Sequence, residues 1–300
     1  MNQQQRLQHF LGTFPQQEPV LLEKELIYTE SYCLEKLLLD LNQQEPVPAY
    51  FAYPYGNQPV PFVLFNHSHG GDFTSGKEEL RSSSSYLQPE SFLEALIEDG
   101  YAVGAIDMWG FGEREQGESA LFKKFSLYGQ TLWGQRIYDN QQFLSYILSR
   151  TEVDSHQIAT IGMSMGGLMS WWLAAVDERI ALVVDLAAQV DYQTLIDENR
   201  LDKHGYYYYV PGVLTAFSTA DIQKMIAPRP RLSLVGQSDP LCPIAGVEKI
   251  NQELQAYYSS LGQPEHWQAK IFKGAHEETK EMRRTWRAFL NRHLDSIDSR

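Results

Sequence analysis

The sequence contains few cysteines, fewer basic than acidic residues, and no long apolar run. Only Cys33 and Cys242 occur in 300 residues, which is too few for a disulfide framework and favours a reducing compartment. Lys and Arg number 25 against 38 Asp and Glu, so the formal net charge is −13 and nucleic acid or an anionic membrane is a disfavoured partner. The run ALVVDLAA is interrupted by Asp185, so no membrane span is predicted.

Targeting segments and linkers are also missing. The opening MNQQQRLQHF has neither the basic nor the apolar region of a signal peptide, so we expect a cytoplasmic protein. No Gly/Ser-rich linker, repeat or charge block marks a second domain. With 43% apolar and 12% aromatic residues the chain can build a large core. We therefore expect a single domain over 1–300 that acts on small molecules, and a homo-oligomer is left open.

Short apolar runs alternate with helical stretches from Pro61 onward, which is typical of βα units and a parallel sheet buried on both faces. The predicted strands are PFVLF (61–65), YAVGAI (101–106), IATIG (158–162), ALVVDL (181–186), RLSLVG (231–236) and AKIF (269–272). Residues 1–60 instead predict a helix and accessory antiparallel strands around CLEKLLLDL and PAYFAYP. The fold class is therefore α/β, a doubly wound and mostly parallel sheet with helices on both faces.

Two long insertions break this alternation, at 107–130 and 188–228. Insertions of this length in a compact α/β domain are usually functional or mobile. Both follow strand ends, so we expect them at the carboxyl edge of the sheet, where open α/β folds bind ligands. The second is a predicted cap insertion.

The segment IATIGMSMGGLMSWWLAA places Ser164 between a predicted strand and a predicted helix. In a nucleophile elbow the serine occupies a strained strand-to-helix turn, so glycines must flank it to let the backbone approach. Gly162, Gly166 and Gly167 meet that need, and the helix that follows directs free N–H groups at an oxyanion. A glycine-rich packing turn is the alternative, but these flanks favour Ser164 as a nucleophile.

A serine nucleophile needs a base, and the base needs an acid to orient it. In elbow-type hydrolases the chain order is Ser, Asp or Glu, then His, and the C-terminal part supplies SLVGQSDPLCP followed by AKIFKGAHEE. Asp239 and His276 each follow a predicted strand, so we predict that they complete a triad with Ser164. Asp185 is the alternative acid, and either Asp239 or His276 alone would pass for a surface loop residue.

The second oxyanion donor is expected from FNHSHGGD, because this segment follows the strand at 61–65. We expect the backbone N–H groups of Met165 and His69 to hold the oxyanion, with Gly70 the alternative to His69. The same segment suggests a metal cluster of His67, His69 and Asp72. The two histidines stand at i and i+2 on an irregular loop and lack a convincing third ligand elsewhere in the sequence, so we predict neither a metal nor a cofactor. For His67 we predict structural hydrogen bonding.

Other polar and aromatic residues receive structural interpretations. Glu277 and Glu278 are expected to begin the last helix, where acidic side chains suit the dipole. Cys242 is expected to be an inert thiol, and Asp107 to fasten the loop that follows it. The run Tyr206–Tyr209 either lines the pocket or packs within a cap. The large aromatics expected in the core or pocket wall are Trp109, Trp133, Trp171 and Trp172.

These motifs resemble the dienelactone hydrolase-like branch of the α/β-hydrolase superfamily, near serine carboxylesterases such as acetyl xylan esterases. The resemblance runs from about Pro61 to the C-terminus and rests on FNHSHGG, AIDMWGFGER, GMSMGG, MIAPRP, VGQSDPLCP and KGAHE. It implies the α/β-hydrolase fold, a core sheet of about eight strands, and ester hydrolysis through an acyl-enzyme. It also implies that MIAPRP precedes the strand that delivers the acid, which favours Asp239 over Asp185.

Dienelactone hydrolases proper carry a cysteine nucleophile, so Ser164 favours simple carboxylic esters as substrates. We therefore expect a serine hydrolase that cleaves small-molecule esters. A peptidase or acyl-peptide hydrolase is one alternative, since the same triad cleaves amides, although such relatives usually add a large gating domain. An inactive hydrolase-fold binding protein is the other, although a pure binder has no need of all three triad residues.

Overall fold

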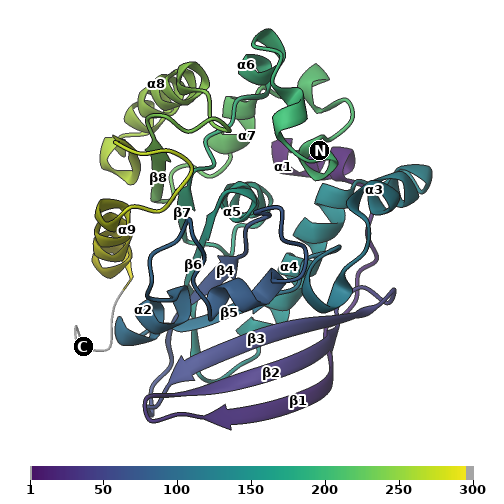
Figure 1. Cartoon of the computed structure of the whole chain (residues 1–300), viewed down its shortest axis with the longest axis vertical. Coiled ribbons are helices and arrows are strands. Elements are labelled where there is room, and N and C mark those ends of the chain that lie inside the picture. Colours follow the sequence, from purple (N-terminus) through teal and green to yellow (C-terminus); the bar gives the residue numbers. More distant parts are fainter. Residues whose placement is uncertain (1, 295–300) are drawn as a thin grey trace.

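The computed structural model describes residues 2–294. Nine strands of this part of the chain form one sheet, in the order β1-β2-β3-β5-β4-β6-β7-β8-β9 (Figure 1). β2 is antiparallel to its neighbours β1 and β3, β3 is antiparallel to β5, and the other neighbouring strands are parallel. The strands are β1 (Val20–Tyr28), β2 (Tyr32–Asp40), β3 (Pro46–Pro54), β4 (Val60–Asn66), β5 (Ala102–Ile106), β6 (Val153–Met163), β7 (Leu182–Leu186), β8 (Arg231–Gly236) and β9 (Trp267–Phe272).

The predicted α/β class with a mostly parallel sheet is confirmed, and β4 to β9 occupy the six predicted strand positions. All seven residues of β4 and all five of β7 are buried, because helices cover both faces of the parallel part. The sheet has one strand more than the eight expected. The strand that the sequence did not reveal is β1, whose sequence VLLEKELIY does not alternate and whose residues are almost all exposed.

Helices cover the two faces of the sheet unequally (Figure 1). α1, α3, α4 and α5 contribute to the hydrophobic core on one face, and α2 and α9 contribute to the core on the other. The helices are α1 (Gln3–Leu11), α2 (Phe92–Glu98), α3 (Glu118–Leu127), α4 (Leu132–Leu148), α5 (Met165–Val176), α6 (Tyr192–Asp197), α7 (Thr219–Lys224), α8 (Ile244–Ser260) and α9 (Lys280–His293).

The first 60 residues form α1 and three strands, β1 to β3, that extend one side of the sheet. α1 begins at a capping box, in which Asn2 and Gln5 satisfy each other's backbone N–H groups. β1 forms the outer edge, and Figure 1 shows no helix beside it. Within residues 2–294, no helix is long and apolar enough to cross a membrane.

Both insertions follow parallel strands. The segment 107–130, after β5, contains α3, and the segment 188–228, after β7, contains α6, α7 and several short 3-10 turns. Parallel strands direct their carboxyl ends to one edge of a sheet. Ser164, which follows β6, and Asp239, which follows β8, therefore lie at the same edge as the two insertions.

Candidate active site

Ser164 occupies a sharp turn between β6 and α5. Its φ of 57° and ψ of −123° are strained for a residue with a side chain, and its N–H donates to the carbonyl of Leu186 at 2.9 Å. The neighbouring glycines are required by contact: a Cβ on Gly166 would lie 1.9 Å from the carbonyl oxygen of Asn66, and one on Gly162 would lie 2.5 Å from it. The glycine pattern therefore reflects close packing of the turn against the end of β4.

Three polar side chains predicted to act together are joined by two hydrogen bonds. His276 Nε2 lies 2.8 Å from Ser164 Oγ, and His276 Nδ1 lies 2.8 Å from Asp239 Oδ2. Asp239 is buried, and its other oxygen accepts the N–H of Leu241 at 2.8 Å. A carboxylate only accepts, so Nδ1 carries the proton and Nε2 is left to accept the Ser164 hydroxyl. This arrangement matches a serine, base and acid in line.

Asp185, the alternative acid, is committed elsewhere. It is fully buried in β7, where it pairs with Arg231 at 2.8 Å and accepts the Ser233 hydroxyl at 2.7 Å. Burial raises the pKa of Asp185, and the adjacent Arg231 charge acts in the opposite direction. Asp185 stabilises the β7–β8 pair, and it is Asp239 that reaches His276.

The segment after β4 holds the proposed second oxyanion donor. His67 is buried, accepts the N–H of Met108 at Nε2 (3.2 Å), and lies 3.0 Å from the carbonyl of Ser68 at Nδ1. Burial lowers the pKa of His67 to about 3, so the ring is neutral and fastens the loop, in line with the structural role predicted for it. Within residues 2–294, no group of three or more His, Cys, Asp or Glu side chains is arranged to hold a metal ion.

Met165 and His69 supply the backbone groups expected to face an oxyanion. Met165 is the first residue of α5, and the first N–H groups of a helix have no acceptor within that helix. The His69 ring is fixed by its neighbours. Its Nδ1 accepts the N–H of Gly71 at 3.2 Å, and the ring stacks on Tyr207 with centroids 5.5 Å apart.

A buried carboxylate that sequence reasoning missed supports this loop. Glu79 accepts the N–H of Ser68 at 2.6 Å and also accepts the Ser68 hydroxyl. Tyr86 donates to Glu79 at 2.5 Å and lies 2.6 Å from the Ser68 hydroxyl. Burial raises the pKa of Glu79, while the bonds from Ser68 and Tyr86 oppose that shift. Glu79 lies 11 residues from Ser68, so spacing gave no signal of this contact.

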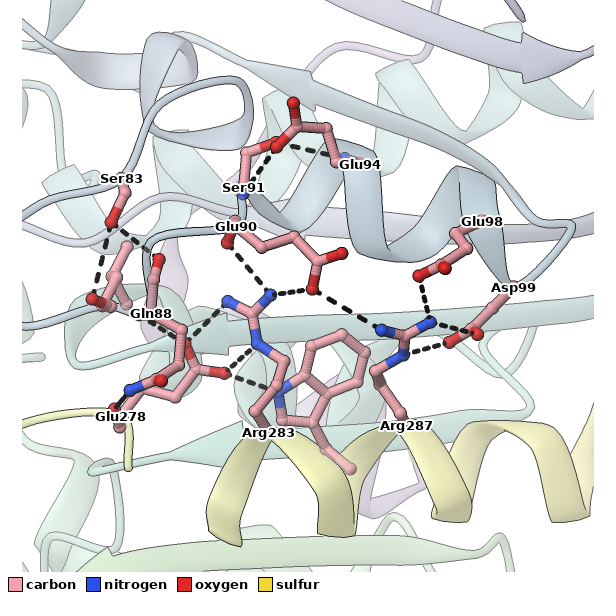
Figure 2. Close-up of polar contacts among 12 residues, drawn as sticks. Ser83, Gln88, Glu90, Ser91, Glu94, Glu98, Asp99, Glu278, Arg283 and Arg287 are labelled. Atoms are coloured by element: carbon pink, nitrogen blue, oxygen red, sulfur yellow. Dashed lines mark hydrogen bonds and ion pairs between the residues drawn. The ribbon is translucent and has the colours of Figure 1, made fainter. Parts of the chain in front are cut away.

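The loop carrying His276 is fastened two residues later, at Glu278. Its N–H donates to the carbonyl of Tyr86 at 2.7 Å, and its buried carboxylate accepts from Arg283 at 2.7 and 2.8 Å and from Trp286 at 2.7 Å. Figure 2 shows Glu278 between Gln88 and Arg283, on the side of α9 that faces the segment 83–91.

The expected position of Glu277 and Glu278 at the start of the last helix is wrong. Thr279 caps α9, which begins at Lys280. Glu278 is buried before the helix and binds Arg283 one turn into it. Burial of Glu278 against Arg283 and Trp286, rather than the helix dipole, explains its place.

Ser164 and His276 open into a cavity of about 350 Å³, a size typical of small-molecule sites. Its walls come from the loop after β4, from Tyr86, from Leu241 and from the 188–228 insertion. The residues around it are Ser68, His69, Gly70, Gly71, Tyr86, Ser164, Lys203, His204, Gly205, Tyr207, Leu241 and His276.

The four consecutive tyrosines divide between the two roles left open by the sequence. Tyr207 lines the cavity and stacks on His69. Tyr208 is fully buried against Tyr192 with centroids 4.5 Å apart, so it belongs to the core of the insertion. Tyr206 is 59% exposed and, with Tyr209, borders a separate hollow.

The remaining structural interpretations agree with the contacts. Burial raises the pKa of the Cys242 thiol well above its usual value, which keeps the sulfur protonated and unreactive. Asp107 is buried and accepts the N–H of Lys77 at 2.7 Å and that of Glu113 at 3.1 Å, which fastens the loop after β5. The buried tryptophans of the core include Trp109, Trp133, Trp171 and Trp172.

Comparison with known proteins finds a matching family and a relative of similar length. The family described as alpha/beta hydrolase fold matches residues 61–209. A protein of Bacillus subtilis (strain 168) named "Putative hydrolase YtaP" is 46% identical over 299 residues, which covers 98% of this chain and 100% of that protein.

Solved structures of low sequence identity share the fold. The acetyl xylan esterase from Paenibacillus sp. R4 is 18% identical with a TM-score of 0.64, over 91% of this chain and 88% of its own. The glucuronoyl esterase from Solibacter usitatus is 13% identical with a TM-score of 0.69, over 97% of this chain and 92% of its own.

Proposed function

This chain belongs to the α/β-hydrolase family, and we propose that within it the protein is a serine esterase that cleaves carboxylic esters of small molecules. The observation that carries the proposal is the pair of 2.8 Å hydrogen bonds joining Ser164, His276 and Asp239, with Ser164 and His276 in the wall of one cavity. The esterase names of the structural neighbours support the choice of ester over amide. The motifs favour the serine esterases of the dienelactone hydrolase-like branch.

The proposed reaction has two halves. Ser164 Oγ attacks the ester carbonyl carbon while His276 Nε2 takes the hydroxyl proton, and the backbone N–H groups of Met165 and His69 hold the resulting oxyanion. Collapse breaks the bond to the alcohol, which leaves with the proton from His276. Water then attacks the acyl-enzyme and loses its proton to His276. Collapse breaks the bond to Ser164 Oγ, which takes the proton back from His276 as the carboxylic acid is released. Asp239 keeps the ring oriented throughout.

Labelling with a fluorophosphonate tests the nucleophile directly. We expect one adduct, at Ser164, and loss of both labelling and ester hydrolysis in Ser164→Ala. The exposed Ser259→Ala variant in α8 should behave like the natural protein. Unchanged hydrolysis by Ser164→Ala would refute the proposal. A folded protein that resists labelling and hydrolyses no ester would favour a binding protein.

A matched ester and amide distinguish the proposed esterase from the alternative, a peptidase. An esterase should hydrolyse 4-nitrophenyl butyrate and leave the corresponding 4-nitroanilide almost untouched. Comparable turnover of the two would favour amide cleavage and overturn the assignment to esters.

A further inference from the structure

The cavity beside Ser164 differs in charge from the protein as a whole. The chain has 38 acidic and 25 basic residues, yet the ionisable residues around the cavity are three histidines, two tyrosines and one lysine. No carboxylate side chain of residues 2–294 is part of the cavity wall. An anionic substrate would therefore meet less repulsion here than on the surrounding surface.

Two buried carboxylates contact residues of the cavity wall, and each is matched by hydrogen-bond donors. Asp239 accepts from His276 and from the Leu241 N–H. Glu79 accepts from Ser68 and Tyr86. Each is buried, so neither presents an unmatched negative charge to a bound ligand.

Glu118 lies behind His69 and is shared between two donors. Its Oε2 is 3.4 Å from His69 Nε2 and 3.6 Å from Arg136 Nη2. Arg136 is fully buried under the Tyr207 ring, 5.1 Å from its centroid. Burial lowers the pKa of Arg136 to about 10, so it remains charged at neutral pH and offsets the Glu118 charge.

Lys203 is the cation of the cavity wall, and no carboxylate of residues 2–294 offsets its charge through an ion pair. It ends a short 3-10 turn of the 188–228 insertion and is exposed. The nearby Arg200 pairs with Glu198 at 2.8 Å, whereas no carboxylate of residues 2–294 forms an ion pair with Lys203. The adjacent Asp202 borders the separate hollow beside Tyr206. The Lys203 ammonium is thus available to a ligand in the cavity.

Resting on the proposed esterase function, we propose that the preferred substrate is an ester carrying a second, negatively charged group, a carboxylate that pairs with Lys203. A single accessible ammonium matches a monoanion, because the second cation near the site, Arg136, is sealed off from the cavity. The cavity of about 350 Å³ has room for both halves of a small ester and the added carboxylate.

Two pairs of matched esters test this inference, because the carboxylate can lie on either side of the ester bond. The acyl-side pair is mono-4-nitrophenyl glutarate and 4-nitrophenyl valerate, and the alcohol-side pair is 4-acetoxybenzoate and 4-acetoxybenzamide. For one pair, we expect kcat/KM to favour the anionic member by about fivefold, the effect of one partly exposed ion pair. The preference should shrink as sodium chloride is added.

Lys203→Gln should abolish that preference by lowering kcat/KM for the anionic ester about fivefold, the size of the preference itself. Lys123→Gln, an exposed lysine of α3, is the matched control and should keep it. Faster hydrolysis of the neutral member in both pairs, or a preference that survives Lys203→Gln, overturns the inference while the esterase function stands. Absence of hydrolysis of all four esters overturns the esterase function and this inference together.

Discussion

The carboxylate of Glu79 accepts both the backbone N–H and the hydroxyl of Ser68. Ser68 immediately precedes His69, whose N–H is the proposed oxyanion donor from this loop. Because consecutive peptide planes share a Cα, fixing the Ser68 amide restricts the direction of the next one. Glu79 is therefore a positioning residue, which acts on the oxyanion through the backbone.

Glu79→Gln should lower kcat by about tenfold with little change in KM, because the oxyanion forms only on the way to the transition state. Binding of a trifluoromethyl ketone analogue should weaken in parallel. Glu78→Gln is the control, since Glu78 contacts Tyr50 and Arg81 instead. If activity falls only in proportion to the folded fraction measured by circular dichroism, Glu79 has a structural role and does not position the oxyanion donor.

Replacing Asp239, the proposed acid, should impair catalysis, whereas replacing Asp185, the alternative acid, should impair stability. Asp239→Asn should lower kcat by about 10⁴-fold with the fold intact, because the ring of His276 loses the acceptor that fixes its tautomer. Steady-state kinetics on a short activated ester, with circular dichroism alongside, measures this. Near-normal turnover would remove Asp239 from the triad.

Asp185→Asn should instead destabilise the protein by about 3–5 kcal/mol, because the buried Arg231 is left without a counter-charge. Urea unfolding measures the loss, and kcat per folded molecule should stay near that of the natural protein. A normal midpoint combined with lost turnover would make Asp185 the acid.

His67 should make the protein less stable in acid. The folded-state pKa of His67, about 3, lies below the unfolded value of about 6.5, so below pH 6.5 the unfolded chain binds a proton that the folded chain excludes. Its contribution to the free energy of unfolding should fall by about 1.4 kcal/mol per pH unit between pH 6 and 4.

The difference in unfolding free energy between the natural protein and His67→Gln isolates this contribution, because other titrating groups are common to both. Urea unfolding of both proteins at several pH values measures this difference. The exposed His156→Gln variant should track the natural protein. A difference that does not change with pH would show that the His67 ring titrates normally in the fold.

Both thiols should be unreactive in the native protein. Cys33 and Cys242 are each 1% exposed, so a reagent cannot reach either sulfur. Burial also raises the pKa of Cys242, which keeps that thiol protonated. A chromogenic disulfide reagent should detect no thiol before denaturation and both after it. Rapid modification of Cys242 in the folded protein would contradict the closed environment described for it.

The sequence predicted those features that depend on local pattern. Buried strands such as 61–65 appear as short apolar runs, and the elbow around Ser164 appears as closely spaced glycines. β1 (Val20–Tyr28) was not predicted, because its exposure on both faces removes the alternation by which a half-buried strand is recognised. Chain order narrowed the acid to two residues, and the position of Asp239 after a predicted strand, together with the family resemblance, favoured it over Asp185.

The residues that support the site could not be predicted in the same way. Glu79, Tyr86 and Glu278 act through contacts between segments far apart in the chain, such as the bond from Glu278 N–H to the Tyr86 carbonyl. The sequence alone does not distinguish a buried glutamate from an exposed one, because burial depends on hydrogen-bond donors elsewhere in the chain. Lys203 and Tyr207 likewise lie in an insertion whose path over the cavity is set by tertiary packing.

Tyr86 connects the two functional halves of the site. Its hydroxyl contacts Ser68 in the oxyanion loop, and its carbonyl accepts the N–H of Glu278 in the loop that carries His276. Neither half can shift far without straining the other, and the loop that carries His276 is also tied to α9 through the pair of Glu278 and Arg283. On slow heating, esterase activity should therefore disappear together with tertiary structure, with no inactive but folded state preceding it.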